Sequence, residues 1–119
     1  MIGIVFMSSD REHDTLLDIV ENAGFVAEYL NGMDFQHFAA SRITVDAIER
    51  CLQRITEAVI RVGEERMAAI APEVPFHALR GLGNRLRQEY DMIDHEILYA
   101  AAVYDVPRLV ERCRAALQQ

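Results

Sequence analysis

Six apolar residues recur between residues 45 and 62 at spacings that alternate between three and four. They are Val45, Ile48, Leu52, Ile55, Val59 and Val62. This spacing puts all of them on one stripe of an α-helix about five turns long. The residues between them are mostly charged or polar, so the opposite face of the helix is expected to meet solvent. A stripe of this length must be buried against other helices, and it therefore predicts a helical bundle.

Further helices are predicted on both sides of this one. A helix over residues 10–31 is expected to stop at Gly32, because glycine readily adopts the left-handed conformation that ends helices. Asp34 can cap the next turn, a third helix is expected from Pro75, and a fourth starts near Asp94. A last helix is expected from Asp105–Pro107. The inward positions predicted for these helices are Leu16, Val20, Ala23, Ala27 and Leu30; Leu79, Leu82 and Leu86; Ile97, Ala101 and Tyr104; and Leu109, Val110, Cys113 and Leu117.

No segment alternates with the period of a β-strand, apart from a short apolar run at residues 1–6 that has no partner strand. The predicted fold class is therefore all-α: an up-and-down bundle of four to five helices. The expected organisation is an N-terminal arm over residues 1–7 and one helical domain over residues 8–119.

Composition narrows the class of protein further. The chain has 119 residues and a formal charge of −7, so a protein that coats nucleic acid generally is not expected. No apolar run reaches the roughly 20 residues that span a bilayer, and no signal peptide is recognised. Two isolated cysteines, Cys51 and Cys113, fall on or beside apolar stripes and are predicted core residues. These features favour the reducing cytoplasm.

Common catalytic motifs are missing from the sequence. There is no Gly-x-Ser-x-Gly elbow, no glycine-rich phosphate loop and no Cys–His pair in a known context. Asp91, Asp94 and His95 cluster, but Asp94 is more simply a helix N-cap and no second histidine-rich half-site exists. Neither a metal nor a cofactor is therefore expected.

The segment from His77 to Gln88 is basic in an otherwise acidic chain. It contains Arg80, Arg85 and Arg87, and no acidic residue lies between Glu73 and Glu89. On a helix, Arg80 and Arg87 share a face with Asn84 between them, and Tyr90 follows on that face. The segment is either a solvated basic face or an anion-binding site.

The order of these signals resembles the HepT-like branch of the HEPN helical-bundle proteins, from about residue 10 to residue 117. The segment Gly81–Tyr90 is similar to the active-site helix of that family. The other matching segments are Glu28–Gly32 followed by Phe35, Ile43–Ile48, Ile55–Ala58, Pro72–Phe76 and Val106–Leu109.

The resemblance implies a homodimeric ribonuclease toxin that is paired with a small nucleotidyltransferase antitoxin, MntA. In that family an Arg-x4-His-x-Tyr motif forms the active site, and the antitoxin transfers AMP to the motif tyrosine. Here the tyrosine corresponds to Tyr90, but Gly83 replaces the arginine and Gln88 replaces the histidine. Because a glutamine amide cannot titrate, the resemblance predicts a ribonuclease that is weak or inactive.

Three functions follow from these observations. The first is a toxin–antitoxin component with Tyr90 as AMP acceptor and with Arg80, Asn84, Arg85 and Arg87 binding RNA phosphates. The second is an active, metal-independent ribonuclease that uses another base, His95 or His77, brought in across the dimer. The third is a non-catalytic helical module that serves as a scaffold for a partner.

Overall fold

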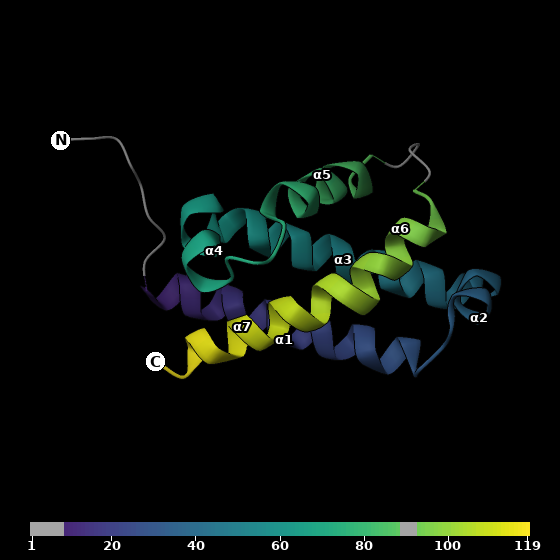
Figure 1. The fold of residues 1–119 in the computed structure, drawn as a ribbon, viewed down its shortest axis with the longest axis horizontal. Helices are drawn as coiled ribbons and strands as arrows, with labels where there is room; N and C mark the ends of the chain where they lie inside the picture. The colour runs from purple at the N-terminus through teal and green to yellow at the C-terminus, as the bar shows by residue number, and fades with distance from the viewer. Residues whose placement is uncertain (1–8, 89–92) are drawn as a thin grey trace.

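A computed structural model describes residues 9–88 and 93–119 as an elongated bundle of helices (Figure 1). The helices are α1 (Ser9–Leu30), α2 (Phe35–Ala40), α3 (Arg42–Val62), α4 (Glu64–Ile70), α5 (Phe76–Leu86), α6 (His95–Ala100) and α7 (Val106–Leu117). A π-helical segment, η1 (Ala101–Asp105), joins α6 to α7 without a break. The predicted all-α bundle is confirmed: α1, α3, α5 and the continuous α6–η1–α7 helix are its long members. The arm predicted over residues 1–7 lies outside the described residues.

Helix α3 runs through the centre of the bundle and contacts α1 on one side and α5 on another. All six residues of its predicted stripe are buried. Helix α1 also packs against α7, so α1, α3 and α7 enclose much of the core. Cys51 and Cys113 are fully buried in that core, as predicted. None of the described helices is both long and apolar enough to cross a lipid bilayer.

The inward face of α1 differs in part from the predicted one. Leu16, Ala23 and Leu30 are buried, but the positions between them are filled by Ile19 and Val26. Val20 is half-buried and Ala27 is exposed. The predicted residues Val20 and Ala27 directly follow the buried residues Ile19 and Val26 in the chain. Either choice gives helical spacing with Leu16, Ala23 and Leu30, because the helix is apolar on two adjacent faces. Periodicity alone therefore could not choose between them.

The ends of the first three helices are set by local backbone chemistry. Asn31 and Gly32 have positive φ angles and end α1, and the Asp34 carboxylate accepts a hydrogen bond of 2.9 Å from the His37 backbone N–H at the start of α2. Helix α3 ends at Gly63, whose φ of 93° is a glycine conformation. The break at Gly63 separates α4 from α3 and was not predicted.

The last two predicted helices form one continuous helix. Pro107 has no N–H, and its ring crowds the carbonyl group four residues earlier. The π-helical turn of η1 lies just before Pro107, where a wider turn relieves this crowding. The last α-helix does begin where it was predicted, at Val106 after Asp105, but it continues directly from η1 and is not a separate helix.

The extra residue in η1 also changes which residues of this helix face inward. Leu98, Ala101 and Ala102 are buried. Ile97 and Tyr104 were predicted to face inward, but they are 43% and 60% exposed.

Candidate functional site

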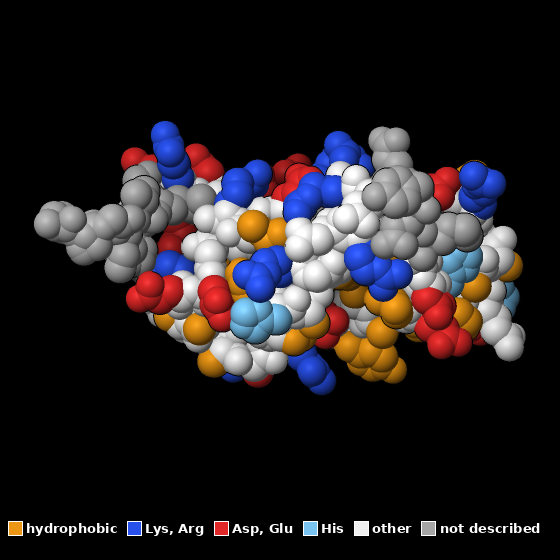
Figure 2. All heavy atoms as spheres, turned by 90° about the horizontal axis from the view of Figure 1, so that it is seen from above, with side chains coloured by type: hydrophobic (Ala, Val, Ile, Leu, Met, Phe, Trp, Pro, Cys, Tyr) orange, Lys and Arg blue, Asp and Glu red, His pale blue; other side chains and the backbone are white. Residues whose placement is uncertain are grey.

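Helix α5 presents its basic side chains to solvent. Leu79 and Leu82 are buried on the face that packs against α3. Arg80, Asn84 and Arg87 lie on the exposed side, while Arg85 is half-buried. We call Arg80, Asn84, Arg85 and Arg87 the α5 basic cluster. Figure 2 looks down on the α5 side of the molecule, where arginine side chains are spread over the surface with acidic side chains among them.

Contacts within α5 hold part of this cluster in place. The Arg87 guanidinium donates a hydrogen bond to the Asn84 side-chain oxygen. The Arg80 guanidinium carbon lies 5.7 Å from the centre of the Phe76 ring, and one of its nitrogens lies 3.3 Å from His77 Nδ1. An arginine has five N–H donors, so these contacts leave donors on both arginines that can bind a phosphate.

Gly83 lies on the buried side of α5, where the helix crosses α3 closely. A Cβ atom at this position would lie 2.7 Å from Thr56 Oγ1 and 2.8 Å from Thr56 Cβ. Thr56 is fully buried, and its hydroxyl donates a hydrogen bond of 2.8 Å to the Leu52 carbonyl. A glycine at position 83 thus permits the close approach of the two helices. An arginine there would require Thr56 to move.

The helix that carries the α5 basic cluster ends before Gln88. Helix α5 ends at Leu86, and the Gln88 backbone N–H donates a hydrogen bond of 3.0 Å to the Arg85 carbonyl just beyond the helix. Gln88 is exposed. Tyr90 and Asp91 lie outside the described residues.

A second group of polar residues lines two hollows, one of them beside the C-terminal end of α5. A hollow of about 220 Å³ lies beside Leu86 and is lined on α3 by Asp46, Glu49, Arg50 and Gln53. Asp46 and Glu49 also line a neighbouring hollow of about 350 Å³, together with His95 at the start of α6. We call the two together the Glu49 hollows. Among residues 9–88 and 93–119, no three His, Cys, Asp or Glu side chains are arranged to hold a metal ion.

The environment of Glu49 changes its acidity. Partial burial raises the pKa of this carboxyl, and the negative charge of Asp46 raises it further, while His95 acts in the opposite direction. His95 itself is exposed, and its ring packs edge-on against Phe38 with 6.3 Å between ring centres. The Asp94 carboxylate accepts a hydrogen bond from the Glu96 backbone N–H, which confirms Asp94 as the N-cap that positions His95.

From its sequence position alone, Glu49 is expected only to belong to the solvent-facing side of its helix. Two of the residues that line the hollows with it lie far along the chain, Leu86 in α5 and His95 in α6. No local pattern links these positions, because the crossing of α3 by other helices brings them together.

His77, the other histidine proposed as a base, lies at the opposite end of α5 from His95. Its Nε2 atom is 2.8 Å from a carboxylate oxygen of Glu64. The two histidines therefore do not form one site within the described part of the chain. The cysteines offer no nucleophile either, since burial raises the pKa of the Cys113 thiol to about 11.

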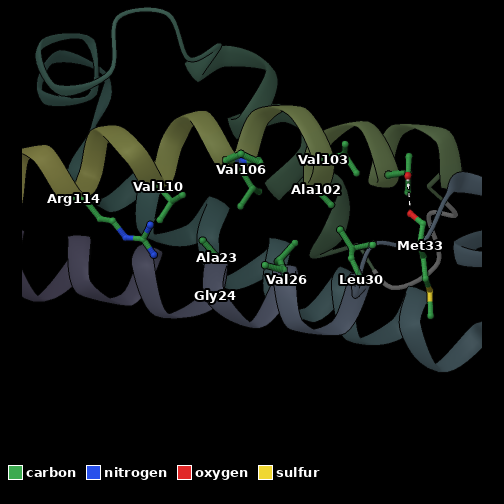
Figure 3. A pocket seen from close by; sticks show the side chains of 14 residues that line it. Ala23, Gly24, Val26, Leu30, Met33, Ala102, Val103, Val106, Val110 and Arg114 are labelled. Carbon is green, nitrogen blue, oxygen red and sulfur yellow. Dashed lines mark hydrogen bonds between the residues drawn. The ribbon is translucent and has the colours of Figure 1, made fainter.

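An apolar groove of about 540 Å³ runs between α1 and the η1–α7 part of the last helix (Figure 3). Small residues of α1, Ala23, Gly24 and Ala27, form part of one wall. Val103 and Val110 line the other wall, and Figure 3 shows Arg114 at one end of the groove. Ala27, which was predicted to face the core, lines this groove instead.

The known proteins that this chain resembles in sequence point to the same family. The family model described as ribonuclease HepT-like matches residues 19–116. A Methanocaldococcus jannaschii protein provisionally named RNase MJ0127 is 32% identical over 92 residues, which cover 77% of this chain and 75% of that protein. A Thermococcus cleftensis protein provisionally named ribonuclease HepT is 27% identical over 100 residues, which cover 83% of this chain and 90% of that protein. No solved structure gives a significant match. The helical bundle and the match over most of its length lead to one conclusion: this chain belongs to the ribonuclease HepT-like family.

Proposed function

We propose that the chain binds RNA through the α5 basic cluster and cleaves it weakly, as the toxin component of a toxin–antitoxin pair in the cytoplasm. The observation that carries the proposal is the exposed row of Arg80, Asn84 and Arg87 in a member of a ribonuclease family. Arginine suits this role because its planar guanidinium binds phosphate oxygens through paired hydrogen bonds.

RNA binding is tested by fluorescence anisotropy with a labelled single-stranded RNA at several salt concentrations. The double variant Arg80→Gln/Arg87→Gln should bind more weakly. The slope of log K against log salt should also become shallower by about 0.7 for each phosphate that is no longer neutralised. Arg108→Gln is the matched control, because Arg108 is exposed on α7, outside the cluster. An equal decrease in affinity for the control, or no binding by the unaltered chain, would favour the scaffold function.

Weak cleavage follows from two replaced motif positions. Gln88 cannot exchange a proton near neutral pH, and Gly83 brings no cation to the phosphate. Restoring the motif should raise cleavage, but Gly83→Arg alone meets Thr56. The triple variant Thr56→Gly/Gly83→Arg/Gln88→His makes space for the arginine. We expect it to cleave RNA faster than both the unaltered chain and the matched variant Thr56→Gly/Gln88→His.

A nucleotidyltransferase partner that adds AMP to Tyr90 forms part of the same proposal. Tyr90 is three residues after Arg87 in the chain, and a cation near the acceptor hydroxyl would stabilise the charge that develops on the transferred phosphate. An AMP group there adds negative charge beside the basic cluster and would weaken RNA binding. Incubation with an MntA-type nucleotidyltransferase and ATP should add the mass of one AMP, and Tyr90→Phe should abolish the gain. A gain that persists in Tyr90→Phe would contradict this assignment.

A homodimer is proposed to bury the groove between α1 and α7. Its walls are apolar and include the exposed Ala27, so a charge placed there should oppose association without disturbing the core. We expect a dimer by light scattering at micromolar concentration, and a monomer for Ala27→Glu. Ala115→Glu, the same substitution at an exposed position of α7 outside the groove, should remain dimeric. A monomeric unaltered chain would refute the dimer.

A further inference from the structure

Cleavage of RNA without a metal requires two proton transfers. One group removes the proton of the 2′-hydroxyl as its oxygen attacks phosphorus, and another group donates a proton to the departing 5′-oxygen. Gln88 can do neither. A chain that retains some cleavage must therefore place other titratable groups near the RNA-binding surface.

The Glu49 hollows hold such groups next to the α5 basic cluster. Leu86, the last residue of α5, lines one hollow with Glu49, and Arg87 follows it directly. His95 lines the other hollow together with the same glutamate. The imidazole and the carboxyl thus line one hollow, and Glu49 also lines the neighbouring hollow, which lies beside the last residue of α5.

The groups that surround this pair are well defined. The charged residues that line the hollows with Glu49 and His95 are Arg42, Asp46 and Arg50, all from α3. Arg42 forms an ion pair of 3.7 Å with Asp46, and Arg50 donates a hydrogen bond of 3.0 Å to the Gln53 side chain. Helices α2 and α5 contribute only the apolar residues Ala39, Ala40 and Leu86. Among the described residues, the ion pair of Arg42 is thus to Asp46 and not to Glu49.

We propose that His95 and Glu49 are the proton-transfer pair of a metal-independent cleavage of unpaired RNA, an inference that rests on the proposed RNA-binding function. A ring nitrogen of His95 takes the 2′-hydroxyl proton while the 2′-oxygen forms a bond to phosphorus. The Glu49 carboxyl gives its proton to the 5′-oxygen as the bond between that oxygen and phosphorus breaks. The products are a 2′,3′-cyclic phosphate and a free 5′-hydroxyl end, and the next cycle begins when the proton returns from His95 to Glu49.

The acidity of Glu49 suits this role. Burial and Asp46 raise the pKa of its carboxyl and keep it protonated to a higher pH than an ordinary glutamate, which increases the fraction that can act as an acid. An exposed imidazole at a helix start is accessible to a substrate that lies across α5 and α6. The cations for the phosphate would be Arg50 and Arg87.

The test is cleavage of a fluorogenic single-stranded RNA by the full chain in the presence of a chelator. His95→Ala should reduce cleavage by about 100-fold or more, while RNA binding measured by anisotropy stays unchanged. Added imidazole should restore part of the activity of His95→Ala. It would not do so if the variant were inactive only because the ring no longer packs against Phe38. Glu49→Gln should remove the alkaline limb of the pH–rate profile. His13→Ala, an exposed histidine on α1, is the matched control and should cleave normally.

The outcomes separate this inference from the function on which it rests. Normal cleavage by His95→Ala would overturn the inference and leave RNA binding standing, and so would RNA binding with no cleavage by the unaltered chain. Loss of activity in His95→Ala that imidazole does not restore would assign the histidine a packing role and also overturn it. An unaltered chain that binds no RNA would remove the proposed function and this inference together.

Discussion

At the scale of single residues, α5 contains two glycines with opposite roles. Nothing lies within 4 Å of a Cβ atom built on Gly81, whereas one on Gly83 meets Thr56. Glycine in an exposed helix interior is less stable than alanine because it loses more backbone entropy on folding. An alanine at position 83 would recover this entropy, but the crowding it would cause where α5 crosses α3 would cost more free energy.

These surroundings predict opposite effects for the same substitution. Gly81→Ala should raise the free energy of unfolding by about 0.5–1 kcal/mol. Gly83→Ala should lower it by about 1–3 kcal/mol. Urea denaturation of the two variants measures both values. A stabilising Gly83→Ala would show that α5 can move away from α3 at little cost.

Glu49 is predicted to lower the stability of the protein at neutral pH. Folding raises the pKa of its carboxyl above the ordinary value of 4.5. Between 4.5 and the raised pKa, the folded chain therefore binds more protons than the unfolded chain. Stability therefore falls across that interval, and the loss persists at higher pH. Glu49→Gln should be more stable than the unaltered chain at pH 7 and should lose this advantage below pH 4.5, as thermal melts at both pH values will show. A less stable variant at pH 7 would contradict this interpretation.

At the scale of helices, spacing explains both the correct and the incorrect predictions. The stripe of α3 alternates strictly between three and four, and all of it is buried. In the last helix, the buried residues Leu98, Ala102 and Val106 are separated by four and four. In a regular α-helix two such steps rotate the stripe by about 80°, and the wider π-helical turn of η1 absorbs this rotation. Because the pattern was matched to a regular helix, it indicated Ile97 and Tyr104 as inward residues.

The junction between α3 and α4 depends on one backbone conformation. Gly63 has φ 93° and ψ 156°, a combination that is essentially restricted to glycine. Gly63→Ala should therefore lower the free energy of unfolding by about 1–3 kcal/mol, although a methyl group would contact nothing. Chemical denaturation provides the measurement, and Gly81→Ala is the comparison that separates backbone strain from a general effect of alanine. If both variants are stabilised, the junction tolerates another conformation.

At the scale of the whole molecule, two arginines connect distant elements. Arg66 of α4 donates hydrogen bonds of 2.7 Å and 3.0 Å to the two carboxylate oxygens of Glu12 in α1. Arg112 of α7 donates a hydrogen bond of 2.5 Å to Glu73 in the loop before α5. In each pair the hydrogen bond from arginine lowers the pKa of the carboxyl.

These pairs predict how stability changes in acid. A carboxyl whose pKa is lowered by folding stabilises the protein above its ordinary pKa of 4.5, and this stabilisation is lost as the pH falls through the lowered value. Glu12→Gln should reduce stability at pH 7 by no more than about 1 kcal/mol, because its partner is half exposed, and should flatten the fall below pH 4.5. Thermal melts from pH 7 to pH 3 test both effects. An acid transition as steep as that of the unaltered chain would show that Glu12 does not contribute.

The sequence predicts the site less completely than it predicts the bundle. The basic residues of α5 are close together in the chain, so helical spacing was enough to place Arg80, Asn84 and Arg87 on one exposed side. Glu49 and Thr56 lie on a helix that was interpreted separately, and their meeting with α5 and α6 depends on how the helices cross. Such crossings are determined by side-chain packing between distant segments, which periodicity within a single segment does not describe.

The contact between Gly83 and Thr56 makes the order of substitutions matter for any change at this position. If an arginine arises first at position 83, it meets a threonine that is fully buried, and the crossing is disrupted. If Thr56 is first replaced by a smaller residue, the chain passes through a variant with a small cavity, and the arginine then has room. The two substitutions therefore favour one order, in which the smaller residue at position 56 comes first. An arginine at position 83 is therefore reached more readily along that path than by direct replacement of the glycine.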